Sequence, residues 1–233
     1  MAKLQLENLT KYYRVGKNEV RALDGVTLDI GDGEFVAVVG RSGSGKTTML
    51  DLIGLLLRPT SGRLLIDDID TAKLGDRDRA HMRAQKVGFV FQEYNLLPGL
   101  NVLENVMLPL RYAKKGSDGR ARALELLERV DLTDRIKHRS SELSGGQQQR
   151  VAIARSMINQ PSLILLDEPT GAVDTETAEQ LVALLKRLNK EDQVTIIVVT
   201  HDLDVASQTS RNIRLKDGKV LSDDRVGVAA AVG

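Results

Sequence analysis

Short, mostly apolar runs recur along the chain, and each ends at polar or small residues. They occupy residues 35–39, 87–91, 163–166 and 194–199. Strands buried on both faces of a parallel sheet show this pattern, whereas half-exposed strands alternate apolar and polar positions. The runs therefore predict the central strands of one buried sheet.

Between these runs the apolar residues recur at helical spacing. Residues 45–57 predict a helix that ends before the turn at 58–62, because Pro59 prevents continuation. Strands alternating with helices favour βαβ units and a parallel sheet. Residues 121–130 and 147–158 both have helical spacing with no strand between them. We therefore expect a helical subdomain at 101–160, inserted into a core formed by 1–100 and 161–221.

The remaining segments are less regular. Residues 1–10 alternate leucines with polar residues, and residues 20–30 and 64–66 also predict strands. Asp217-Gly218 suits a tight hairpin near the end of the chain, because glycine accepts positive φ. We expect one domain over 1–221 and a flexible tail at 222–233.

Composition narrows the class of protein. The 233 residues are 42% hydrophobic and 28% charged, which is ordinary for a globular protein. The 33 basic and 32 acidic side chains give a net charge of +1, so no overall positive field attracts nucleic acid. The absence of cysteine excludes disulfides and thiolate metal sites and agrees with a cytoplasmic location. The longest apolar stretch, 49–57, is far short of the ~20 residues that span a bilayer.

A glycine-rich segment joins the 35–39 run to the 45–57 helix. It matches G-x-x-x-x-G-K-[ST], whose backbone N–H groups point at phosphate oxygens. Lys46 would reach the β- and γ-phosphates, and Thr47 would place its hydroxyl on Mg²⁺. An unliganded Gly-Ser turn is the alternative, which the preceding strand and the Lys-Thr pair disfavour. The segment comprises Gly40, Arg41, Ser42, Gly43, Ser44, Gly45, Lys46 and Thr47, followed by Thr48.

Two carboxylates, Asp167 and Glu168, directly follow the 163–166 run. Adjacent strand residues point to opposite faces, so the two side chains serve different purposes. Asp167 is the candidate Mg²⁺ partner, directly or through water, and Glu168 is the candidate base that polarises an attacking water. Two idle, solvated acids are the alternative, which a nearby phosphate loop disfavours.

Three further positions are candidates by location. Ligands of open α/β sheets bind beyond the carboxyl ends of the strands. His201 is therefore a candidate contact to a γ-phosphate, and Gln92 a candidate ligand of Mg²⁺ or water; a structural role is the alternative for each. One ring of the Tyr12-Tyr13 pair could stack on a purine, or the rings could pack under the sheet, and the residues leave this open.

A second anion-binding pattern opens the predicted 147–158 helix. Residues 143–147 read Leu-Ser-Gly-Gly-Gln, which places backbone N–H groups and a hydroxyl at a helix N-terminus. With the phosphate loop, the chain has two half-sites for one phosphate chain, which suggests a protein that works as a pair. The pattern comprises Leu143, Ser144, Gly145, Gly146 and Gln147.

The order of these motifs resembles that of ATP-binding cassette (ABC) ATPases. The resemblance covers about residues 3–221 and includes Asp174, which follows the acidic pair. Segments 88–92, 95–98 and 144–154 are similar to the branch containing lipoprotein-release, macrolide-export and antimicrobial-peptide-export ATPases. The resemblance implies an α/β fold: a P-loop NTPase core with a mostly parallel sheet, an N-terminal antiparallel β subdomain and the helical insertion.

The resemblance also implies a head-to-tail dimer of two copies. ATP would lie between the phosphate loop of one copy and residues 144–146 of the other. Tyr13 would stack on adenine and His201 would hold the γ-phosphate. Gln92 would sense Mg²⁺ and a membrane partner, and Asp174 would bridge to the opposite site. An integral membrane permease would dock on a groove between core and insertion, here involving residues 94–101, unless the leucines of that segment serve only to pack the insertion.

The expected function is therefore ATP hydrolysis by the nucleotide-binding subunit of a membrane transporter or mechanotransmission complex, driving export or release at the cytoplasmic face of the membrane. A soluble superfamily member acting in DNA repair or translation is the alternative. Such proteins typically have a long coiled coil, or two cassettes with a basic linker, and the sequence contains neither. A small-molecule kinase would leave residues 143–147 unexplained.

Overall fold

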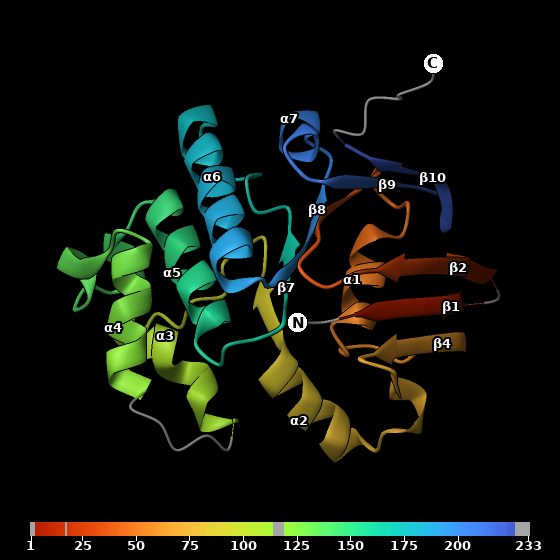
Figure 1. Cartoon of the computed structure of the whole chain (residues 1–233), viewed down its shortest axis with the longest axis horizontal. Coiled ribbons are helices and arrows are strands. Elements are labelled where there is room, and N and C mark those ends of the chain that lie inside the picture. The colour runs from red at the N-terminus through yellow and green to blue at the C-terminus, as the bar shows by residue number, and fades with distance from the viewer. Residues whose placement is uncertain (1–2, 17, 114–118, 227–233) are drawn as a thin grey trace.

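The structure is a computed structural model that describes residues 3–16, 18–113 and 119–226. The protein contains two β-sheets, of which the antiparallel one lies at one side of the molecule, while most of the helices lie at the other side (Figure 1). The first sheet is antiparallel, has four strands and has the order β2-β1-β4-β5. This sheet confirms the expected N-terminal antiparallel β subdomain. Its strands are β1 (Leu4–Val15), β2 (Asn18–Ile30), β4 (Ser61–Ile66) and β5 (Ile69–Asp70).

The second sheet has six strands in the order β10-β9-β3-β8-β7-β6. Neighbouring strands are parallel except for β10, which runs antiparallel to β9 as the second arm of the predicted hairpin. Three of the four apolar runs form the interior strands β3, β8 and β7, and the run at 87–91 forms the edge strand β6, which confirms the mostly parallel α/β core. The strands are β3 (Phe35–Val39), β6 (Val87–Val90), β7 (Leu163–Asp167), β8 (Thr195–Thr200), β9 (Arg211–Lys216) and β10 (Lys219–Arg225).

Each face of this sheet supports its own hydrophobic core. In β3, Val36 and Val38 face α1 (Lys46–Ile53) and the antiparallel sheet, while Ala37 and Val39 face the remaining helices. Successive side chains of a strand point to opposite faces, so one apolar run serves both cores. The second core packs α3 (Val102–Met107), α4 (Gly119–Arg129), α5 (Gly145–Met157), α6 (Thr175–Asp192) and α7 (Leu203–Ser207).

The helical insertion lies to one side of the sheets (Figure 1). It contains α3, α4 and α5, joined by short 3₁₀ helices at Leu108–Arg111, Thr133–Arg135 and Ser140–Glu142. Another 3₁₀ turn at Thr71–Lys73 leads into α2 (Asp76–Lys86), which contacts β6. Among the described residues, no helix is both long and apolar enough to cross a membrane.

Two predicted boundaries were wrong. The helix predicted at 45–57 ends at Ile53, because Leu55 has a positive φ of 60° and the Leu56 N–H turns back to donate to the Asp51 carbonyl, at 2.8 Å. Residues 222–225 belong to β10 instead of a tail, because the strand pairs with β9 and Asp223 binds Arg211. The rest of the predicted tail, 227–233, lies outside the described residues.

Candidate active site

The phosphate loop connects β3 to α1 and is shaped by its own lysine. Lys46 Nζ donates hydrogen bonds to the carbonyl oxygens of Gly40, at 2.9 Å, and Arg41, at 3.2 Å. Gly45 has φ of 103°, and a Cβ there would lie 2.2 Å from Ala22 O, so a side chain at this position would be both strained and crowded. The buried Ser44 hydroxyl has no hydrogen-bond partner among the described residues. This cradle of N–H groups, cation and free hydroxyl suits a phosphate chain.

Thr47 and Asp167 meet at the mouth of this loop. Thr47 is in the first turn of α1 and Asp167 ends β7, and the Thr47 hydroxyl lies close enough to the Asp167 carboxylate to influence its pKa. Burial raises the pKa of Asp167 and the neighbouring Glu168 raises it further, while the hydrogen bond from Thr47 and the charge of Lys46 oppose the shift. A hydroxyl and a partly desolvated carboxylate are oxygen donors of the kind that Mg²⁺ accepts.

Asp51 was missed as a neighbour of this pair. It lies four residues after Thr47 on α1, and burial followed by repulsion from Asp167 raises its pKa. The i,i+4 spacing from Thr47 could have indicated it, because residues four apart share a helix face.

Glu168 is held by three groups beyond the end of β7. Its carboxylate lies 3.0 Å from His201 Nδ1, and it accepts hydrogen bonds from the Thr200 hydroxyl, at 3.3 Å, and the His201 backbone N–H, at 3.4 Å. Glu168 has a positive φ of 45°, which is unusual for a residue with a side chain and which re-aims the carboxylate relative to the strand. The predicted base and the predicted γ-phosphate contact therefore lie side by side, and Thr200 joins them.

Gln92 lies near Glu168, on the other side of Gly171. A Cβ on Gly171 would lie 3.9 Å from Gln92 Nε2 and 3.8 Å from Glu168 Cβ. Gly171 therefore lies between the two residues and close to both. The loop that begins at Gln92 continues through Tyr94 and Asn95, both with positive φ. The structure thus brings Gln92 to the predicted site.

The Leu-Ser-Gly-Gly-Gln segment forms the start of α5. Ser144 is the N-cap: its hydroxyl accepts from the Gln147 N–H, and Gln147 Oε1 accepts from the Ser144 N–H in a capping box. The close contact of Gly146 with α6 leaves no room for a side chain, because a Cβ there would lie 2.5 Å from Thr177 Cγ2. The N–H groups of this first turn and the helix dipole are the groups of the predicted second anion half-site.

Asp174 lies next to this half-site. It caps α6 by accepting hydrogen bonds from the Thr177 N–H, at 2.9 Å, and the Thr177 hydroxyl, at 2.8 Å. These hydrogen bonds hold its pKa below the usual range. The contact between Thr177 and Gly146 therefore joins Asp174 to the start of α5 within one chain.

Tyr12 and Tyr13 lie in different surroundings. The Tyr12 hydroxyl donates a 2.6 Å hydrogen bond to Asp24. The Tyr13 side chain is 36% exposed, with Lys11 Nζ 5.3 Å from its ring centroid. Packing under the sheet therefore does not apply to Tyr13, whose stacking on adenine stays a prediction.

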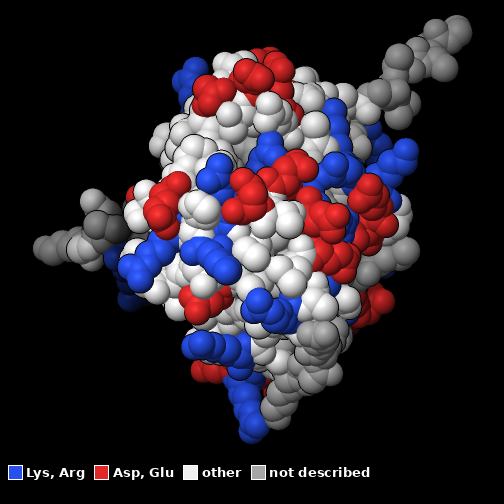
Figure 2. Space-filling model, turned by 90° about the vertical axis from the view of Figure 1, so that its left-hand side faces the viewer, with Lys and Arg blue, Asp and Glu red and all other residues white. Residues whose placement is uncertain are grey.

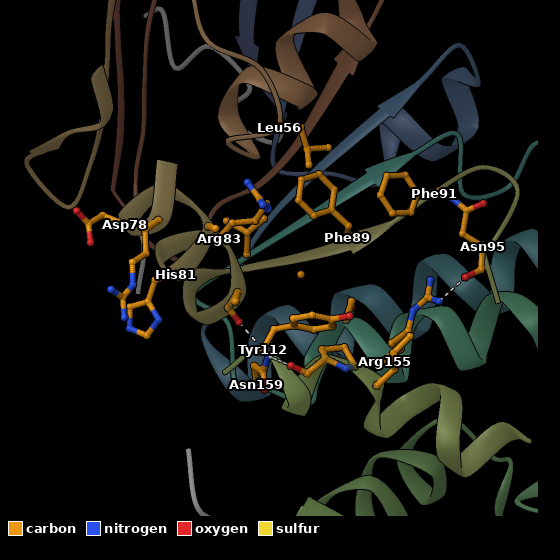
Figure 3. Close-up of a pocket in the computed structure, with 18 residues that line it drawn as sticks. Leu56, Asp78, His81, Arg83, Phe89, Phe91, Asn95, Tyr112, Arg155 and Asn159 are labelled. Carbon is orange, nitrogen blue, oxygen red and sulfur yellow. Dashed lines mark hydrogen bonds between the residues drawn. The ribbon is translucent and has the colours of Figure 1, made fainter. Parts of the chain in front are cut away.

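The predicted docking segment, 94–101, contains both packed and exposed side chains. Tyr94 and Leu96 pack against the helical core, whereas Leu97 is exposed. The adjacent hollow is the α2–α5 groove, a cavity of about 880 Å³, to which this segment contributes Asn95 (Figure 3). Phe89 and Phe91 line one wall, with stacked rings whose centroids are 5.4 Å apart, and Tyr112 lies on the opposite wall. Besides these residues, the groove includes Leu56, His81 and Arg155.

Comparison with known proteins identifies the family. Residues 23–171 match the family model described as ABC transporter. The chain is 50% identical over 228 residues to an uncharacterized ABC transporter ATP-binding protein, MJ0796, of Methanocaldococcus jannaschii, covering 96% of this chain and 97% of that protein. It is 48% identical over 220 residues to a macrolide export ATP-binding/permease protein, MacB, of Syntrophobacter fumaroxidans, covering 93% of this chain but 31% of that protein.

Solved structures agree with the sequence relatives. A dimeric structure of MJ0796, a bacterial ABC transporter cassette, superimposes with a TM-score of 0.89 at 49% identity, covering 96% of this chain and 98% of that one. A dimeric post-hydrolysis state of the same cassette, bound to ADP and Pi, gives a TM-score of 0.88 at 48% identity, with the same coverage. The chain belongs to the ABC transporter ATPase family, and it is an ATPase whose relatives include the macrolide-export branch.

Proposed function

We propose that this protein is the nucleotide-binding subunit of a membrane transporter, or of a related force-transmitting membrane complex, and that it drives export or release. Two copies bind head to tail around ATP. The phosphate loop of each copy faces residues 144–146 of the other, and hydrolysis separates the copies. The MJ0796 cassette, which is similar over nearly the whole chain, is a dimer in two solved structures.

The observation that carries this proposal is the division of the anion-binding groups within one chain. The phosphate loop opens α1, which belongs to the core on one face of the parallel sheet, and residues 144–146 open α5, which belongs to the core on the other face (Figure 1). Each half-site has backbone N–H groups at a helix N-terminus, and a phosphate chain is best neutralised when donors surround it. A second copy, turned by a two-fold axis, would supply the missing half.

The residues around the phosphate loop fit Mg²⁺ and ATP. Thr47, Asp167 and Gln92 would hold the ion, which commonly keeps water and substrate phosphates among its ligands. When bound, Mg²⁺ would neutralise charge on the β- and γ-phosphates. Lys46 would donate to the same phosphates, and the exposed ring of Tyr13 would stack on adenine.

Glu168 and His201 would divide the work of hydrolysis. Glu168 would accept a proton from the attacking water, because its carboxylate is held by hydrogen bonds at the carboxyl end of β7. His201 would leave Glu168 and donate to the γ-phosphate, which its exposed position beside the carboxylate permits. Gln92 would orient water or the ion from across Gly171. Asp174 would connect this site to the opposite one.

The α2–α5 groove is the proposed docking site for the permease. Its aromatic walls, formed by Phe89, Phe91 and Tyr112, are open enough to receive apolar side chains of a short helix (Figure 3). MacB joins an ATP-binding part and a permease part in one protein, of which this chain matches about a third. We infer that an integral membrane permease binds here and holds this protein peripherally at the cytoplasmic face of the membrane.

Nucleic acid is a poor partner for this surface. Figure 2 shows basic and acidic side chains interspersed over the face that carries the helical insertion. The net charge of +1 agrees with this mixture. Binding to nucleic-acid backbones depends on concentrated positive charge, so neither observation favours a role in DNA repair or translation.

The proposal is tested by copurification from native membranes, with bound proteins identified by mass spectrometry. We expect an integral membrane permease to copurify with the wild-type protein and to be lost with Tyr112→Asp. Tyr112 is 71% exposed, so the change should place a charge in the groove without unfolding the chain. The matched control is Leu221→Asp on β10, which replaces a 61% exposed apolar residue outside the groove and should retain the permease. Recovery of DNA or ribosomes in place of a permease would overturn the proposal.

A further inference from the structure

Arg155 is a buried cation on α5 that has no carboxylate partner. Its side chain is 9% exposed, and among the described residues it forms no salt bridge. Burial lowers the pKa of its guanidinium, as expected where charge loses water without gaining a counter-ion. A buried cation of this kind requires strong hydrogen bonds to remain in place.

The guanidinium of Arg155 binds the loop that carries Gln92. Nη2 donates to the Tyr94 carbonyl and Nη1 to the Asn95 carbonyl, each at 2.6 Å, and Figure 3 shows the second of these bonds beside the α2–α5 groove. Tyr94 and Asn95 both have positive φ, at 57° and 49°. The planar fork of an arginine matches two neighbouring acceptors, which makes this attachment directional.

The same loop also touches the other end of α5. The Tyr94 hydroxyl lies 3.2 Å from the position that a Cβ on Gly145 would occupy, so the ring reaches the half-site at the start of the helix. Burial raises the pKa of Tyr94. Tyr94 is therefore bound through its carbonyl to Arg155, near the end of α5, and its ring covers Gly145, at the start of the same helix.

We propose that Arg155 is a positioning residue that makes the Gln92 loop and the residue 144–146 half-site move as one unit. A displacement of Gln92 in one copy would then be passed to the half-site that serves the other copy's nucleotide. This inference rests on the proposed function, because it assumes that residues 144–146 act in a dimer. Arg155 needs no contact with ATP for this role.

The test compares variants in a Glu168→Gln background, where ATP is retained. Arg155→Met keeps the length of the side chain and removes its donors, and Arg155→Lys keeps the charge without the planar fork. The matched control is Arg150→Met, on the same helix, because Arg150 donates to Asp131, to the Val130 carbonyl and to Gln180 and not to the Gln92 loop. Dimerisation is followed by light scattering and monomer binding by a fluorescent ATP analogue.

We expect Arg155→Met to weaken Mg²⁺-ATP-driven dimerisation about tenfold or more, since charge-assisted hydrogen bonds are lost. Binding of nucleotide to the monomer should remain unchanged, because the phosphate loop is intact. Arg155→Lys should fall between Arg155→Met and the parent, and Arg150→Met should resemble the parent. A general loss of folding would instead lower monomer binding as well.

A second readout follows the motion itself. The chain has no cysteine, so spin labels attached through Glu142→Cys and Lys73→Cys would report the separation of the insertion and the core. We expect ATP to shift this separation in the parent and to leave it unshifted in Arg155→Met. If that variant does not fold, Arg155→Lys decides the question by the same measurement.

Two outcomes are distinguishable. Failure of the Glu168→Gln parent to dimerise with ATP would overturn the proposed function. Parent-like dimerisation and label separation in a folded Arg155→Met protein, or in Arg155→Lys where it alone folds, would overturn the role of Arg155 and leave the proposed function standing.

Discussion

At the scale of single residues, the proposed role of the Glu168 carboxylate can be tested directly by substitution. Glu168→Gln keeps the size and the ability to accept from Thr200 but removes the proton acceptor. We expect ATP turnover to fall by at least ~10², while ATP binding is preserved, because loss of a general base has effects of this size. Phosphate release and nucleotide binding measure the two quantities. Glu125→Gln, at an exposed position of α4, is the control, and near-normal turnover in Glu168→Gln would refute the assignment.

Asp51 gives a prediction about pH. Its pKa is raised by burial first and by Asp167 second. An acid with a raised pKa in the fold holds its proton more tightly than the unfolded chain does, so its ionisation opposes folding as pH rises above the usual aspartate value of about 4. Asp51→Asn removes this cost. We expect the nucleotide-free variant to gain thermal stability over the wild type, and to gain more at pH 7.5 than at pH 4.5.

Thermal melts at the two pH values measure this effect. The control is Asp68→Asn, an exposed residue near Lys3 whose charge is mostly solvated. If Asp51→Asn gains no thermal stability at pH 7.5, or gains as much at pH 4.5 as at pH 7.5, the result would contradict the repulsion between Asp51 and Asp167.

The sequence predicted which residues would lie together where a motif fixes the backbone. The phosphate loop, Asp167, Glu168, Gln92 and His201 lie at the carboxyl ends of β3, β8, β7 and β6, at one edge of the sheet. Thr200 and Arg155 were not anticipated, because their partners are a carboxylate 32 residues away and two backbone carbonyls 60 and 61 residues away in the chain. Such contacts depend on tertiary packing, and a single sequence has no local signal for them.

At the scale of elements, β10 pairs with β9 and is also held by a charged contact. Arg211 donates to both carboxylate oxygens of Asp223, at 2.6 Å each, and also to Glu34. We expect Asp223→Asn to lower the free energy of unfolding by about 1–3 kcal/mol at pH 7, as for other charge-assisted hydrogen bonds. Urea unfolding measures this change, and the control is Asp224→Asn on the same strand, whose carboxylate accepts a hydrogen bond from Ser222 and from no other side chain among the described residues.

The pH dependence of this contribution has a definite sign. Hydrogen bonds from Arg211 hold the pKa of Asp223 below its usual range. The stabilisation is therefore complete above the usual aspartate pKa and is lost as pH falls through the lowered value. The free energies of unfolding of the wild type and of Asp223→Asn should therefore become more similar in acid. A difference in the free energy of unfolding that persists unchanged in acid would contradict a contribution from the charge of Asp223.

The helices and strands that are rich in apolar residues were easier to predict from the sequence than the polar ones. The central strands β3, β7 and β8 are nearly all apolar, so their burial is visible in the sequence. Edge strand β10 and helix α2 have mostly polar side chains, and each is fixed by interactions that local patterns do not display. In α2 the buried residue is Arg79, which donates to the carbonyls of Leu55 and Leu57.

At the scale of the whole molecule, a composite site predicts complementation between two inactive proteins. Lys46→Ala removes the cation of the phosphate loop, and Ser144→Arg places a bulky charge in the other half-site. In a head-to-tail dimer of the two variants, one site contains both lesions and the other contains neither. We expect a 1:1 mixture to recover about a quarter of the wild-type rate, because about half of randomly formed two-fold dimers are mixed and each has one intact site.

Phosphate release by the mixture, compared with each variant alone, measures this recovery. A site formed within one chain would behave differently, because every chain in the mixture would still contain its own lesion and the mixture would stay inactive. Lys46→Ala mixed with the double variant Lys46→Ala/Ser144→Arg is the matched control, since none of its dimers has an intact site. Ser144 also caps α5, a contribution of typically about 1 kcal/mol, so melting curves must first establish that Ser144→Arg is folded. Recovery in the first mixture and none in the control would require that ATP is hydrolysed between two copies.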